Sequence, residues 1–376
     1  MSQSKDMTVG AILPLLFNFT MPLLLGNLLQ QTYSLVDAAI VGKFLGINAL
    51  ASVGASTSVV FLILGFCNGC CGGFGIPVAQ KFGAHDYRTM RRLVAVSLKL
   101  AGIMSVAITL VTCLLCSFIL EWMQTPDNIF EDAYYYLLIT FIGIPCTFYY
   151  NLLSSILRAL GDSKTPFWFL LFSTVLNILL DLLCIVVLKW GVAGAAIATV
   201  FSQGVSAVLC YLYMYLKFEI LRTTPADRRF RPELARQLIY IGAPMGLQFS
   251  ITAIGSIMLQ SSNNALGTAC VAAFTAAMRI KMFFLCMLES LGIAMATYCG
   301  QNYGAGKPLR IWQGVKVASG MIARILVSLV AVPMWGFWAV CFGDPTAWVF
   351  ADLFLIPAFI YVYRRLCGIV VRETNS

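Results

Sequence analysis

The chain has 376 residues, of which 60% are hydrophobic and 11% are charged, and its formal net charge is +9. A soluble domain has about a quarter charged residues, so this composition excludes a protein that is in contact with water alone. Apolar stretches of about 20 residues recur along the whole chain, and each is long enough to cross the hydrocarbon core as a helix.

In chain order, we expect about ten membrane-spanning helices, at residues 14–36, 50–76, 94–119, 134–155, 167–188, 192–216, 238–261, 269–298, 317–338 and 345–363. The alternation of apolar and polar residues that marks barrel strands is missing from them. The first span contains Pro22 and is too long for a cleaved signal peptide, so we expect it to stay in the protein. The predicted fold class is an all-α polytopic membrane protein.

The basic residues fall on one side of the predicted membrane. With a cytoplasmic N-terminus, 19 of the 25 Lys and Arg residues lie in cytoplasmic segments, whereas the outer connections hold only Lys43 and Lys189. This asymmetry predicts that both termini are cytoplasmic. We expect the basic run Arg228-Arg229-Phe-Arg231 to contact anionic membrane lipid and not nucleic acid.

Cysteine and glycine are best explained by packing. Cys67 and Cys70 have the spacing of a zinc pair, but His85 is the only histidine in the sequence. We expect the 13 cysteines to be small core residues. Gly65, Gly69 and Gly73 recur every fourth residue, which predicts close packing against another helix.

The chain contains an internal repeat. Gln80-x-x-Gly83-Ala84 recurs 221 residues later as Gln301-x-x-Gly304-Ala305. Trp190-Gly191 recurs only 145 residues later as Trp335-Gly336, so a segment matching about residues 97–172 has no counterpart in the second half. The repeat predicts two parallel helical bundles with six and four helices: residues 1–216, a cytoplasmic linker at 217–237, and a truncated bundle at 238–376.

The motifs together resemble the multidrug and toxic compound extrusion (MATE) transporters. They include Pro22, Gln30-Gln31, Val36-Asp37, Leu45-Gly46, Arg158-Ala-Leu-Gly161-Asp162-Ser163, Asn177-x-x-x-Asp181 and Gly300-Gln301-Asn302-Tyr303-Gly304-Ala305-Gly306. The bacterial DinF-type branch is the most similar, because the seventh span has no carboxylate. The resemblance implies twelve helices in two bundles, from which this chain departs by two, and ion-driven export without enzymatic activity.

Carboxylates at membrane depth are expensive and therefore mark functional positions. Four qualify, at Asp37, Asp181, Glu289 and Asp352. From the residues alone, Asp37 is either functional or an interfacial acid, and Asp181 with Asn177 is either functional or a packing pair. Glu289 either faces a cleft or pairs across helices, and Asp352 has the same two interpretations.

The family resemblance implies a site for a coupling cation or proton in the first bundle. Carried over by position, this site uses Asp37, Asn177, Asp181 and Thr199, with the backbone carbonyl of Ala195. Oxygen ligands suit Na⁺, and a buried carboxyl group also suits proton exchange, so both coupling ions stay open. Further candidates, for a substrate cavity, are Tyr33, Phe61, Tyr149, Tyr150, Phe274, Arg279 and Glu289.

Three functions follow as expectations. The first is an antiporter that exports amphipathic or cationic drug-like molecules in exchange for Na⁺ or H⁺. The second is a flippase for lipid-linked saccharides of the same superfamily, favoured by Arg279 and Lys281. The third is a truncated membrane protein that does not transport. The sequence has no nucleotide-binding loop, and we expect no cofactor beyond the coupling ion, no metal other than Na⁺, no nucleic-acid partner and no obligate protein partner.

Overall fold

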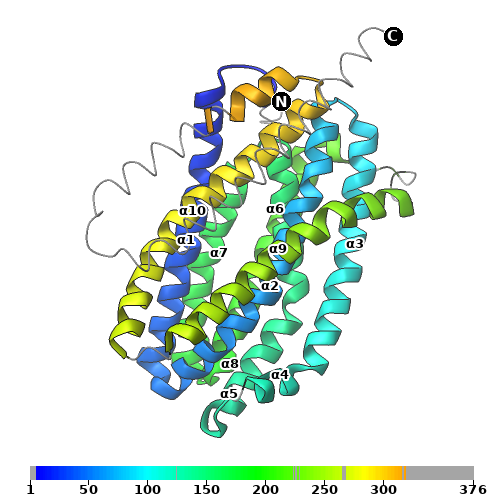
Figure 1. Ribbon diagram of the computed structural model, residues 1–376. Helices are drawn as coiled ribbons and strands as arrows, with labels where there is room; N and C mark the ends of the chain where they lie inside the picture. Colours follow the sequence, from blue (N-terminus) through cyan, green and yellow to red (C-terminus); the bar gives the residue numbers. More distant parts are fainter. Residues whose placement is uncertain are drawn as a thin grey trace.

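The computed structural model describes residues 6–123, 125–222, 224, 227, 229–264, 268–315 and 317–318. In these residues every element is a helix: α1 (Ile12–Leu45), α2 (Ile47–Gly83), α3 (Tyr87–Leu114), α4 (Cys116–Trp122), α5 (Asp127–Ile142), α6 (Ile144–Ala159), α7 (Lys164–Leu182), η1 (Leu183–Val187), α8 (Gly191–Lys217), η2 (Glu219–Leu221), α9 (Pro232–Asn264) and α10 (Thr268–Gly304). Figure 1 shows α1 to α8 as a bundle, with α9 and α10 lying across one side of it.

The first eight predicted spans all fall on these helices, and the ninth and tenth, apart from residues 317–318, lie outside the described residues. Within the described part, six helices are long and apolar enough to cross a membrane, or seven if α5 and α6 form one span. The third and fourth spans are less regular than we expected. Helix α3 gives way to α4 at Leu115, and α5 and α6 meet at Gly143 with a bend of 45°.

Two of the sequence motifs form the connections between helices. Gly161 has a φ of +83°, which favours glycine, and turns the chain after α6. Asp162 then accepts hydrogen bonds from the backbone N–H groups of Lys164 (3.1 Å) and Thr165 (3.0 Å), and so caps the start of α7. Gly46, at a φ of +91°, turns the chain between α1 and α2 in the same way.

The glycines of α2 contact α9, as their spacing predicted. A Cβ atom on Gly69 would lie 2.5 Å from the Met245 carbonyl oxygen, and one on Gly73 would lie 2.5 Å from the Cα atom of Gly242. Gly246 on α9 is equally close to α2, against Phe66 and Cys70. The two backbones can approach this closely only because these positions have no side chain.

The internal repeat is visible in the helix bounds. Helix α10 begins and ends 221 residues after α2, and both helices have 37 residues. Their ends cross through matching residues: Gly83 lies against the Gln301 carbonyl, and Gly304 lies against the Gln80 carbonyl. In Figure 1 this crossing lies at the upper end of the molecule, near the N-terminus.

The core of the bundle is built around α2, α3, α5, α6 and α8. Cys67, Cys70 and Cys71 are fully buried in it, and every described cysteine is a free thiol that is buried or half-buried. Packing therefore accounts for the cysteines that the structure describes.

The segment after α8 is anchored to the start of α3 by one acidic residue. Asp227 Oδ2 lies 3.3 Å from Arg91 Nε, and its Oδ1 lies 3.4 Å from Arg92 Nε. The Thr224 hydroxyl also donates to Asp227, at 2.8 Å. With a side chain only 4% exposed, Asp227 is a buried anchor for the linker.

Candidate functional site

Three helices present polar side chains to one another within the otherwise apolar bundle. On α1 these are Gln30, Tyr33 and Asp37; on α7, Ser173, Thr174, Asn177 and Asp181; on α8, Thr199, Ser202 and Gln203. Along each helix the residues recur at spacings of three or four positions, with Ser173–Thr174 and Ser202–Gln203 as adjacent pairs, so they form one stripe. The stripes of α1, α7 and α8 face one another, since Tyr33 and Asn177 both contact Thr199.

The two acidic residues lie side by side at one end of these stripes. The carboxyl groups of Asp37 and Asp181 are close enough to share a hydrogen bond, and the two residues are 9% and 0% exposed. Each has an Oδ1 atom that is buried without a hydrogen-bond partner in the described part of the chain. Two ionised carboxyl groups that are this close together and this deeply buried would repel each other strongly. The pair is therefore suited to holding a proton or a cation.

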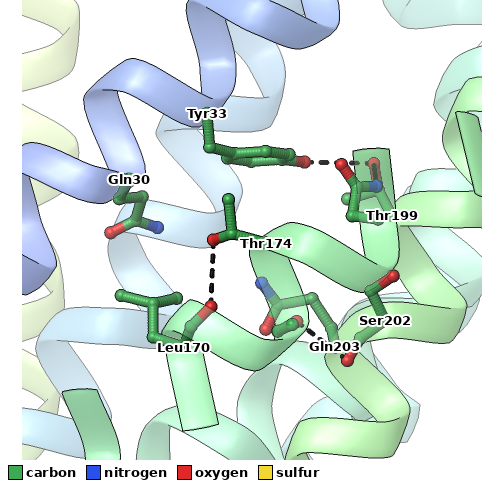
Figure 2. A pocket seen from close by; sticks show the side chains of 9 residues that line it. Gln30, Tyr33, Leu170, Thr174, Thr199, Ser202 and Gln203 are labelled. Carbon is green, nitrogen blue, oxygen red and sulfur yellow. Dashed lines mark hydrogen bonds between the residues drawn. The ribbon is translucent and has the colours of Figure 1, made fainter. Parts of the chain in front are cut away.

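Asn177 and Thr199 complete the polar surroundings of the pair. With its amide oriented to satisfy its neighbours, Asn177 donates to Asp181 Oδ2 at 3.0 Å and accepts from the Thr199 N–H at 3.2 Å and from its hydroxyl at 3.3 Å. The Tyr33 hydroxyl lies 3.1 Å from Thr199 Oγ1 (Figure 2). Thr199 thus links α1, α7 and α8.

A π-helical turn follows directly after this site. Leu183–Val187 is π-helical, beginning two residues after Asp181. Such turns are rare and occur mostly at functional positions. Here the turn ends the helix that carries both Asn177 and Asp181.

A pocket adjoins the carboxyl pair between α1, α7 and α8. It is lined by Gln30, Tyr33, Leu170, Ser173, Thr174, Asn177, Thr199, Ser202 and Gln203. In Figure 2, Tyr33 reaches from α1 toward Thr199, with Gln30 and Thr174 nearby. Ser202 Oγ and Gln203 Oε1 are buried without a partner among the described residues, so the pocket has unused polar groups.

The structure brings together most residues predicted for the ion site. Asp37, Asn177, Asp181 and Thr199 converge, and Ala195 is buried one helical turn before Thr199. All of the ligands on offer are oxygens, the type that hard cations prefer.

The predicted cavity residues are more scattered. Tyr33 lines the pocket, whereas Tyr149 and Tyr150 pack inside the bundle, where they donate to the carbonyls of Leu98 and Pro166. Phe61 and Glu289 are exposed, on α2 and α10. The side chains of Phe274 and Arg279 lie outside the described residues.

Sequence reasoning missed Tyr136 and three polar residues that line the pocket, Ser173, Ser202 and Gln203. Tyr136 lies on α5 near both Asp37 and Asp181, and only the tertiary fold brings it there. Ser173, Ser202 and Gln203 could have been found from the spacing of polar residues along α7 and α8.

Long apolar helices that surround a buried carboxyl pair define a multi-pass α-helical membrane protein. The family model described as MatE matches residues 22–183 and 241–363. A "Probable multidrug resistance protein YpnP" from Bacillus subtilis is 33% identical over 309 residues, which are 82% of this chain and 69% of the relative. The chain therefore belongs to the MATE family, whose members are transporters and not enzymes.

Two further comparisons also find transporters. An "FAD transporter" from Shewanella oneidensis is 23% identical over 341 residues, covering 89% of this chain and 74% of the relative. A solved structure of an outward-facing multidrug resistance MATE family transporter of the MOP superfamily matches with a TM-score of 0.80 and 25% identity, covering 88% of this chain and 74% of that one.

Proposed function

We propose that this protein exports amphipathic or cationic small molecules across the bacterial inner membrane, in exchange for Na⁺ or H⁺. The observation that carries the proposal is the buried Asp37–Asp181 pair, whose Oδ1 atoms lack partners among the described residues and which adjoins a polar pocket. The family and the names of relatives such as the multidrug resistance protein of Bacillus subtilis support the substrate class.

The chemistry of the pair favours exchange. When both carboxyl groups are ionised, their repulsion is relieved by a cation between them or by a proton on one of them. Tyr33 and Asn177 connect the pair to the pocket through Thr199, so a change of charge at Asp181 alters the hydrogen bonding of the pocket wall. Ion binding and pocket shape are thereby coupled.

The test is transport by the 376-residue chain in proteoliposomes with an imposed Na⁺ or H⁺ gradient. We expect gradient-driven movement of an organic cation, and its loss in Asp37→Asn and Asp181→Asn. Glu121→Gln is the control, because Glu121 is exposed far from the pair. Transport by both Asp variants at the wild-type rate would contradict the proposed role of the pair.

A second candidate is transport of a larger anionic or saccharide-bearing substrate. Arg279 and Lys281, in the sequence of α10, and the similarity to a relative named as an FAD transporter favour it. Offering an anionic nucleotide in the same vesicles separates the two candidates. Ion binding without movement of either substrate would instead indicate that the shortened second half does not support transport.

A further inference from the structure

The residues that precede α1 are held by the end of α10 and the residues just after it. Residues 6–10, here called the N-terminal strap, lie against the end of α10 and the residues that follow it. Met7 and Thr8 are only 1% and 4% exposed. Asn302 Nδ2 donates to the Met7 carbonyl (3.2 Å), Lys307 Nζ to the Thr8 carbonyl (3.0 Å) and Arg310 Nη2 to the Gly10 carbonyl (2.7 Å).

Gln301 joins the strap to the first bundle. Its Oε1 accepts from the Met7 N–H at 2.8 Å, and its Nε2 donates to the Ala159 carbonyl at the end of α6, also at 2.8 Å. Its own backbone carbonyl packs against Gly83 at the crossing of α2 and α10. Gln301 is fully buried, so one amide connects the strap, α6 and α10 in a place without water.

The repeat-related residue on α2 lacks this role. Gln80 occupies the matching position and its backbone contacts Gly304, but its half-buried side chain makes no hydrogen bond within the described part of the structure. The residue that would correspond to Ala159 belongs to the segment that the second half of the sequence lacks. The crossing is thus symmetric in its backbone contacts and one-sided in its side-chain bonds.

We propose that Gln301 and the N-terminal strap form a bolt that keeps the α2–α10 end of the protein closed. Opening a path between α10 and the first bundle at this end requires the Gln301 contacts with Met7 and Ala159 to break together, because the same amide makes both. Gln301 is therefore a positioning residue for the closed state. This inference deepens the transport function proposed above and rests on it for its biological meaning.

The experiment measures the distance between spin labels at Arg88→Cys and Leu309→Cys, two exposed positions that flank the crossing at the start of α3 and after α10. The protein is placed in lipid nanodiscs without substrate or an ion gradient, with accessible native cysteines replaced. We expect one short-distance population for the wild type. Gln301→Ala should add a longer-distance population, whereas the matched control Gln80→Ala should not.

Hydrogen exchange of the strap supplies the second measurement. Exchange of the 6–12 segment should rise at least about tenfold in Gln301→Ala, because Met7 loses its acceptor, and stay unchanged in Gln80→Ala. If Gln301→Ala does not fold, Lys307→Met and Met7→Pro test the same bolt by removing one strap contact each. An unchanged distance distribution in the folded strap variants, or equal opening in Gln80→Ala, would overturn the proposal. Because no ion or drug is present, this result is independent of whether transport itself is detected.

Discussion

Thr199 is the residue on which the polar contacts of the site converge. Its hydroxyl contacts both Tyr33 and Asn177, and these connect it to the pocket wall and to Asp181. Thr174 lines the same pocket, but among the described residues its hydroxyl bonds only to the Leu170 carbonyl of its own helix, at 2.9 Å. The two threonines therefore differ in what their hydroxyl groups hold together.

Replacing Thr199 by valine should weaken ion binding. The substitution keeps the shape but removes the hydroxyl; if ion binding loses the equivalent of one hydrogen bond, about 0.5–1.5 kcal/mol, the affinity for the coupling ion falls about two- to tenfold. Ion-dependent change in tryptophan fluorescence measures this affinity. Thr174→Val, the matched control, should bind with wild-type affinity, and an equal loss in both variants would show that Thr199 has no special role.

For single residues of the site, the sequence predicts those that belong to a motif. It misses those that only the tertiary fold brings close to the Asp37–Asp181 pair. Asp37, Asn177 and Asp181 could be chosen because polar groups in apolar helices are costly and their spacing matches a known pattern. Tyr136 could not, because it lies about 100 residues from Asp37 in the sequence and reaches the pair through the packing of α5. For Tyr150, nothing in the sequence distinguishes a tyrosine that packs in the core from one that lines a cavity.

Among the elements, the contact of α2 with α9 depends on the absence of side chains. Gly73→Ala should lower the melting temperature in detergent, because its Cβ would overlap the Gly242 backbone and overpacking costs about 1–3 kcal/mol. Gly72→Ala is the control on the same helix, since its Cβ would meet only the flexible end of Met245, at 3.7 Å. Equal melting of the two variants would refute the close approach of these helices.

The attachment of the linker to α3 depends on the charge of Asp227. Burial alone would raise the pKa of Asp227, but hydrogen bonds from Thr224 and Arg91 outweigh it and hold the pKa below its ordinary value. Since the folded pKa is the lower one, the anchor is fully stabilising above the unfolded value of about 3.9 and is lost only as the pH falls through the folded value. It should therefore be unchanged between pH 8 and pH 5.

Asp227→Asn should release the linker at every pH. We expect trypsin to cut at Arg229 about tenfold faster, from a loss of about 1.5 kcal/mol for hydrogen bonds to a charged group. Glu219→Gln is the control, because Glu219 pairs with Arg222 in an exposed contact that contributes little. A cleavage rate that rises in the wild type between pH 8 and pH 5, after correction for trypsin activity, would contradict this account.

The existence of the helices was easier to predict than their ends. Apolar runs of about 20 residues gave the first eight spans, because lipid leaves the backbone few alternatives. The breaks at Leu115 and Gly143 and the π-helical turn after Asp181 were not visible in the apolar pattern, because all three lie within uninterrupted apolar sequence. Glycine spacing predicted that α2 packs closely on another helix, but not that the partner is α9.

For the whole molecule, the orientation in the membrane is open to direct measurement. Basic residues gather at the end where α2 meets α3 and α8 meets α9, which predicts that this end is cytoplasmic. An impermeant maleimide added to intact cells should label Asp127→Cys and not Arg222→Cys, both of which are exposed positions. Labelling of Arg222→Cys alone would show that the orientation in the membrane is the opposite of the predicted one. The division into six and four helices stays a prediction, because the last two spans lie outside the described residues.

The contact between Met7 and Gln301 joins positions 294 residues apart. A ribosome that has delivered α1 to α8 to the membrane has not yet made Gln301, so the strap, which is synthesised before α1, finds its partners among the last described residues. Until α10 is inserted, the amide of Met7 and the carbonyls of Thr8 and Gly10 have water as their hydrogen-bond partner. Closure of this end is therefore a late event in biogenesis. A nascent chain stalled before α10 would contain the complete Asp37–Asp181 site in a bundle that still lacks its bolt.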